Sequence, residues 1–75
     1  MRESLMKISD CIKNIRFNMG ITQTELASRI DKDKASISLY ESGQRKPGFP
    51  TIKRLIDLAN ANGMNLKFTD LRDDL

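Results

Sequence analysis

Residues 22–43, TQTELASRIDKDKASISLYESG, decide the fold of this chain because they hold two helix signals separated by a very short turn. Thr22 is a good N-cap, and Glu25 three residues later can close a capping box with it. We therefore predict a helix over residues 22–30 that is too short to be stable without packing on other elements. Its apolar side consists of Leu26, Ala27 and Ile30.

The second helix signal in this stretch begins at Asp33, which is also a favoured N-cap. Gly43 can take the positive φ that ends a helix, so we predict a helix over residues 33–42. Only Asp31 and Lys32 separate the two helices, and so short a turn makes them cross steeply, as in a helix-turn-helix. The residues expected to face the core are Ile37 and Tyr40.

The flanking segments have the apolar spacing of two further helices, predicted over residues 4–18 and 50–62. Gly20 and Gly63 follow these helices as end signals. A chain of 75 residues is long enough for one small core, so we expect one all-α domain of four helices over residues 1–75. The apolar stripes of the two flanking helices are Leu5, Ile8, Ile12, Ile15 and Met19, and Ile52, Leu55, Ile56 and Ala59.

After the last helix, apolar and polar residues alternate over residues 64–69, a pattern typical of a strand with one buried face. No other segment reads as a strand, so we expect this one to pair with the same strand of a second copy. The alternative is an extended segment packed on the helix over 50–62. The predicted dimer interface is Met64, Leu66 and Phe68. Residues 70–75 form an acidic tail, read either as a solvated end or as a partner-binding segment.

Composition argues against catalysis. One cysteine and no histidine exclude internal disulfides, His/Cys zinc sites and Ser-His or Cys-His pairs. The acidic residues show no paired arrangement, so we expect no catalytic residues, no metal, no cofactor and no enzyme. No apolar run approaches a membrane span, and we expect a cytoplasmic protein. Basic side chains outnumber acidic ones in residues 1–54, as in proteins that bind polyanions.

The T-Q-x-E-L-A opening of residues 22–43 and their I-S-x-Y-E-x-G end occur together, and with them residues 8–62 resemble the Xre family of lambda-repressor-like helix-turn-helix domains. The segment PTIKRLIDLANANGMNLKF is similar to HipB-type antitoxins, in which the fourth helix leads into a strand paired across a dimer. The resemblance implies a homodimeric repressor of its own operon that also binds a kinase-like toxin. Two positions depart from the family pattern: Asp31 replaces the usual turn glycine, and Lys32 replaces an apolar residue.

In a helix-turn-helix the second helix enters the major groove of double-stranded DNA with its N-terminal side chains toward the bases. The expected base-facing residues are Lys34, Ala35, Ser36, Ser38 and Leu39. Few of these side chains make bidentate base contacts, so DNA shape is expected to contribute to specificity.

We expect phosphate contacts from Thr22, Gln23, Lys32, Gln44, Arg45 and Lys46, with Lys53 and Arg54 as further candidates. For Gln23 and the basic loop, the alternative is simple solvent exposure. Arg16 and Glu41 match a family ion pair and are assigned to structure.

The function expected from these observations is an autorepressing, HipB-like antitoxin that binds a palindromic operator as a homodimer. A stand-alone phage or restriction-control type repressor is the first alternative. A module that binds a protein through the helix over 33–42 is the second.

Overall fold

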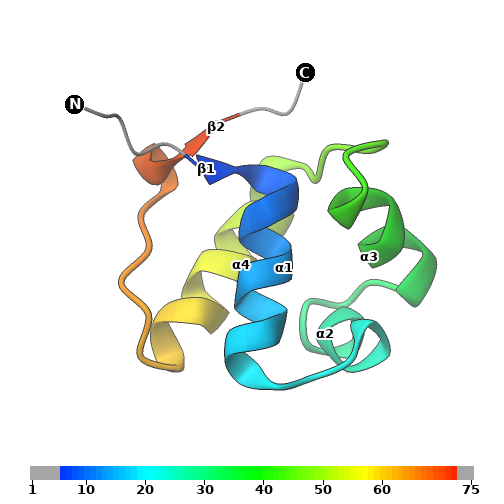
Figure 1. The fold of residues 1–75 in the computed structure, drawn as a ribbon, viewed down its shortest axis with the longest axis horizontal. Helices are drawn as coiled ribbons and strands as arrows, with labels where there is room; N and C mark the ends of the chain where they lie inside the picture. The colour runs from blue at the N-terminus through cyan, green and yellow to red at the C-terminus, as the bar shows by residue number, and fades with distance from the viewer. Residues whose placement is uncertain (1–5, 73–75) are drawn as a thin grey trace.

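The computed structural model describes residues 6–72, and in this part of the chain four helices pack around one core (Figure 1). The helices are α1 (Ile8–Met19), α2 (Gln23–Arg29), α3 (Lys34–Glu41) and α4 (Phe49–Ala61). They are accompanied by a short 3-10 helix, η1 (Phe68–Asp70), and two short strands, β1 (Met6–Lys7) and β2 (Leu71–Arg72). The all-α prediction with four helices is therefore confirmed.

Every helix contributes apolar side chains to the core, and α1 lies between α4 on one side and the α2–α3 pair on the other (Figure 1). Burying one such side chain fully contributes roughly 1.5–3 kcal/mol, so the short α2 and α3 are stable only as part of this core. The predicted inward residues of α2 and α3 are all buried. The core consists of Ile8, Cys11, Ile12, Ile15, Leu26, Ala27, Ile30, Ile37, Tyr40, Ile52, Leu55, Ala59 and Leu66.

The helices α1 to α4 end in the same way, with a residue at positive φ followed by a backbone N–H that donates five residues back. The N···O distances are 3.2 Å for Ile21 to Arg16, 2.8 Å for Lys32 to Ala27, 3.0 Å for Gln44 to Leu39 and 3.1 Å for Met64 to Ala59. Glycine occupies the positive-φ position after α1, α3 and α4, whereas Asp31, at φ 60°, occupies it after α2. Asp31, which replaces the glycine usual in the family, therefore adopts the left-handed conformation.

The predicted boundaries need one correction at the N-terminus. The first helix was predicted from residue 4, but Met6–Lys7 form β1 and α1 begins at Ile8. Residues 4 and 5 lie outside the described part of the chain. A two-residue strand is too short to show an alternating pattern, which is why the apolar spacing alone extended the helix.

The predicted strand over residues 64–69 is wrong. Residues 64–67 have no regular secondary structure and run into η1, while the strand that does form, β2, pairs in parallel with β1 of the same chain. The register places Met6 opposite Leu71 and Lys7 opposite Arg72. Of the predicted acidic tail, Asp70 belongs to η1, the next two residues form β2, and residues 73–75 lie outside the described residues.

The Asn60 side chain explains why residues 64–67 are extended without a strand partner. Asn60 Oδ1 accepts from Leu66 N at 2.8 Å, and Asn60 Nδ2 donates to Leu66 O at 3.0 Å. One amide thus satisfies both backbone groups that a neighbouring strand would otherwise bind. Leu66 is buried in the core and its two neighbours are exposed, which produces the alternating pattern. The extended segment packed on α4, the alternative to a strand, is what the structure contains.

Candidate nucleic-acid interface

The start of each helix in the α2–turn–α3 unit is fixed by a side-chain cap. Thr22 Oγ1 accepts from Glu25 N at 3.1 Å, and Asp33 Oδ1 accepts from Ser36 N at 2.9 Å. The Ser36 hydroxyl and backbone hydrogen bonds lower the pKa of Asp33. Glu25 does not close the predicted capping box, because its Oε2 pairs with Arg29 Nη2 at 2.9 Å, a favourable spacing of four residues.

The predicted base-facing residues lie on the outward side of α3. Lys34, Ala35 and Ser38 are exposed, and Ser36 and Leu39 are half-buried. Ile37, which lies between Ser36 and Ser38, and Tyr40, which follows Leu39, are buried in the core. The first turn of α3 therefore presents an ammonium group, a methyl group and hydroxyl groups to solvent, on a helix whose opposite side is anchored.

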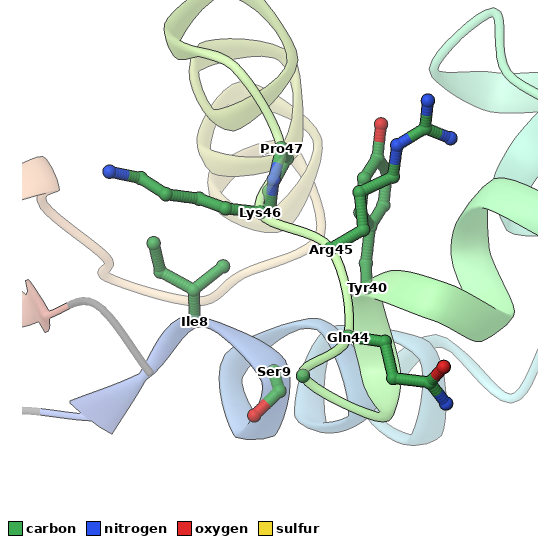
Figure 2. Close-up of a pocket in the computed structure, with 8 residues that line it drawn as sticks. Ile8, Ser9, Tyr40, Gln44, Arg45, Lys46 and Pro47 are labelled. Atoms are coloured by element: carbon green, nitrogen blue, oxygen red, sulfur yellow. The ribbon is translucent and has the colours of Figure 1, made fainter. Parts of the chain in front are cut away.

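The basic loop after α3 is fixed at both of its ends. Gln44 N and Arg45 N both donate to Leu39 O, at 3.0 and 3.3 Å, and the buried Pro47 anchors the other end. In Figure 2 the Arg45 side chain runs beside Tyr40, the Lys46 side chain extends over Ile8, and Gln44 points away from both. The Arg45 charge makes the smallest of several contributions to the lowered pKa of Asp33, the cap of α3.

The small cavity under this loop is lined by α1, Tyr40 and loop residues (Figure 2). Its volume of about 40 Å³ has room for a water molecule or two and not for an organic cofactor. The loop therefore packs over α1 with little empty space beneath it. The predicted phosphate contacts in the loop, Gln44, Arg45 and Lys46, are all exposed.

Gln23, the predicted phosphate-binding glutamine, is held by an ion pair. Arg16 and Glu41 form the pair that the sequence predicts, with Nε to Oε2 at 2.7 Å and Nη2 to Oε1 at 3.2 Å. Gln23 Nε2 donates to the same Glu41 Oε1 at 3.1 Å. Arg16 Nη1 also donates to Ile21 O at 3.4 Å. The network joins the end of α1, the first turn of α2 and the end of α3.

The protonation state of Glu41 follows from this network. Burial alone would raise the pKa of the carboxyl group, but hydrogen bonds from Arg16 and Gln23 and the charges of Arg16 and Lys13 together lower it. The hydrogen bond to Glu41 in turn raises the pKa of Arg16. Both groups are charged at neutral pH, so the amide of Gln23 has a fixed acceptor at the start of α2.

The α2–α3 turn is braced by a residue whose role the sequence did not reveal. Arg54 of α4, expected only as a candidate for phosphate binding, donates from Nη1 to Ile30 O at 3.2 Å. The same Nη1 lies 3.8 Å from Asp31 Oδ2. The sequence signal that could have indicated this role is the aspartate at a position where the turn usually has glycine, because such a turn gains stability from an additional contact. Lys32, the other unusual residue of the turn, is exposed as a phosphate contact requires.

The three residues of the predicted dimer interface differ in how much of each side chain is exposed. Leu66 is 8% exposed and belongs to the core of its own chain, whereas Met64 is half-buried against that core. Phe68 is 51% exposed and packs edge-on against Phe49, with ring centroids 5.3 Å apart. Only part of the predicted interface is thus available to a partner.

Among residues 6–72, no helix is long and apolar enough to cross a membrane. Nor does this part of the chain bring together three or more Asp, Glu, Cys or His side chains in a group able to hold a metal ion.

A helix-turn-helix family model, HTH_3, matches residues 12–66. The chain belongs to the Xre-type helix-turn-helix family. The match runs from α1 to Leu66 and includes all of α2, α3 and the basic loop. Membership makes this protein a DNA-binding protein of a family that is typically not enzymatic. No curated protein and no solved structure matches the chain.

Proposed function

We propose that this helix-turn-helix protein is a sequence-specific transcriptional regulator that places the first turn of α3 in the major groove of its operator. The observation that carries this proposal is the outward face of α3, where Lys34, Ala35 and Ser38 are exposed on a helix anchored by Ile37 and Tyr40. A rigid, exposed helix start is the element that reads base edges in proteins of this class.

Phosphate contacts are proposed on two sides of this helix. At the start of α2, Thr22 is exposed and Gln23 is half-buried, and the N-terminus of a helix favours an anion. In the loop after α3, Gln44, Arg45 and Lys46 are exposed. Each neutralised phosphate releases counterions, so operator binding weakens steeply as the salt concentration rises.

The regulator is proposed to bind a palindromic operator as a homodimer, with half-sites about one helical turn apart. Two small domains that each contact a few base pairs gain specificity by binding together. Of the predicted interface, Phe68 offers the most exposed apolar surface, and Met64 lies next to the core.

A HipB-like antitoxin is a narrower form of this proposal. The similarity that suggested it included a strand over residues 64–69, and these residues are not a strand in one chain. The observation that would support the antitoxin role is therefore a toxin that binds this chain. A kinase-like protein encoded beside this gene that co-purifies with the chain would establish it, and its absence would leave a stand-alone repressor.

The test is an electrophoretic shift on the DNA upstream of the gene, with unlabelled non-specific DNA as competitor. The triple variant Lys34→Ala, Arg45→Ala and Lys46→Ala is compared with the control Lys7→Ala, Lys67→Ala and Arg72→Ala, which removes the same charge from exposed positions elsewhere. We expect a competitor-resistant band for the wild type and the control, and none for the interface variant. A protein-interaction module would give no such band with any of the three proteins.

A further inference from the structure

The turn between α2 and α3 is the one helix end in residues 6–72 where a residue with a side chain replaces glycine at positive φ. A Cβ makes this conformation less favourable, and aspartate tolerates it better than most residues do. The backbone bond from Lys32 N to Ala27 O is nevertheless intact at 2.8 Å. A contact from outside the turn that offsets this cost would stabilise the turn further.

Arg54 is positioned to do so. Its guanidinium reaches from α4 to Ile30 O, 3.2 Å away, at the end of α2 where helix carbonyls lack intrahelical partners. A cation at a helix C-terminus is also favoured by the helix dipole. The same nitrogen lies 3.8 Å from the Asp31 carboxylate, so one side chain contacts both residues that lead into the turn.

We propose that Arg54 is a positioning residue for DNA recognition, which fixes the α2–α3 turn and through it the orientation of α3. This inference rests on the function proposed above. Asp33, the cap of α3, follows Asp31 by two residues, and Lys34 begins the helix. Recognition groups must be held to within about 0.5 Å and 10–20° of their productive geometry. A looser turn displaces every base-facing side chain together.

The competing role for Arg54 is direct contact with a DNA phosphate, since its side chain is 56% exposed. Lys67 is the control, because it is an exposed basic residue outside the helix-turn-helix and has no proposed contact with DNA. The two roles differ in three measurable ways.

The first experiment needs no DNA. Amide hydrogen exchange of Arg54→Ala is compared with wild type at Lys32, Ile21, Gln44 and Met64, whose N–H groups make the equivalent bond at the four helix ends. Loss of a charged hydrogen bond at the turn speeds exchange at Lys32 about tenfold, and the other three amides stay within about twofold. Equal changes at all four, or none at Lys32, would overturn the inference even if the protein binds DNA.

The second experiment measures operator affinity against salt concentration for a wild type that binds operator DNA. As a positioning residue, Arg54→Ala weakens binding about fivefold to tenfold and leaves the slope of log K against log salt unchanged. If Arg54 instead binds a phosphate, its removal lowers the magnitude of that slope by about 0.9 for each subunit, or about 1.8 for the homodimer, which overturns the inference. Lys67→Ala changes neither quantity.

The third experiment is a rescue. Asp31→Gly in the Arg54→Ala background removes the need for the brace, because glycine adopts positive φ without strain. The double variant recovers operator affinity to within about twofold of wild type. Asp31→Gly also removes a negative charge that would repel DNA, so Asp31→Ala in the same background is the control, because it removes the charge and keeps a Cβ at positive φ. Recovery with glycine and not with alanine supports the proposal, whereas equal recovery with both, or an affinity that stays low with glycine, contradicts it.

Discussion

Arg16 Nε donates to Glu41 Oε2 at 2.7 Å across twenty-five residues of sequence, with only 17% of the arginine side chain and 7% of the glutamate side chain exposed. This pair joins the last turn of α1 to the last residue of α3 and also holds Gln23 at the start of α2. The recognition helix is therefore tied to the rest of the domain at its C-terminal end by an ion pair.

Removing one partner of this pair leaves the other charge largely buried. We expect Glu41→Leu and Arg16→Met each to lower the free energy of unfolding by about 3–5 kcal/mol. The double variant loses less than the sum of the two, because neither charge remains. Urea denaturation of the four proteins measures both quantities, and single variants within about 1 kcal/mol of wild type would show that the pair contributes little.

The lowered pKa of Glu41 predicts how stability depends on pH. The folded-state pKa lies below the unfolded value of about 4.3. The carboxylate therefore stabilises the fold fully above that value and loses its contribution as the pH falls through the folded-state pKa. Glu41→Gln, which cannot ionise, should show a shallower loss of stability below about pH 4.5. Parallel acid-denaturation curves for the two proteins would contradict this assignment.

Replacing Asp31 by glycine is expected to keep or raise the stability of the fold. Asp31→Gly relieves the left-handed backbone at φ 60° and gives up an exposed ion pair at 3.8 Å that contributes little. We expect the free energy of unfolding to stay level or rise by up to about 1 kcal/mol, whereas Asp31→Val lowers it by about 1–2 kcal/mol. Thermal unfolding of both variants gives the order, and a valine variant as stable as wild type would be inconsistent with the observed φ.

The thiol of Cys11 is expected to react slowly with alkylating reagents. Burial, with a smaller effect of the Asp70 charge, raises its pKa to about 11, and its side chain lies in the core. The thiolate is the reactive form, so labelling by iodoacetamide at pH 8 is expected on the order of a hundredfold slower than for an exposed cysteine. The rate should rise with the unfolded fraction as urea is added. Native labelling as fast as that of free cysteine would mean that the N-terminal part of α1 opens readily.

The helix-turn-helix could be predicted from sequence because its signals are local. The caps at Thr22 and Asp33 and the glycines after the helices lie within a few residues of the ends they set. The pairing of Arg16 with Glu41 was predicted through the family pattern, since a pair separated by twenty-five residues leaves no periodic trace.

Contacts made by single polar side chains between distant elements could not be predicted in this way. The alternation over residues 64–69 indicated the burial of Leu66 correctly, although Phe68 is 51% exposed, and it carried no information about which group binds the Leu66 backbone. That role belongs to Asn60, whose position on α4 looks like any exposed helix residue. Arg54 is likewise one basic residue among several in the sequence, and only its distance to Ile30 distinguishes it.

The most direct test of base recognition by α3 is selection of bound duplexes from a random DNA library by the wild-type protein and by Lys34→Ala. We predict that the wild type enriches an inverted repeat with half-sites about one helical turn apart, and that Lys34→Ala relaxes the preference at one position in each half-site. Sequences that stay random with the wild type, or an identical motif with both proteins, would contradict the claim that α3 reads the operator.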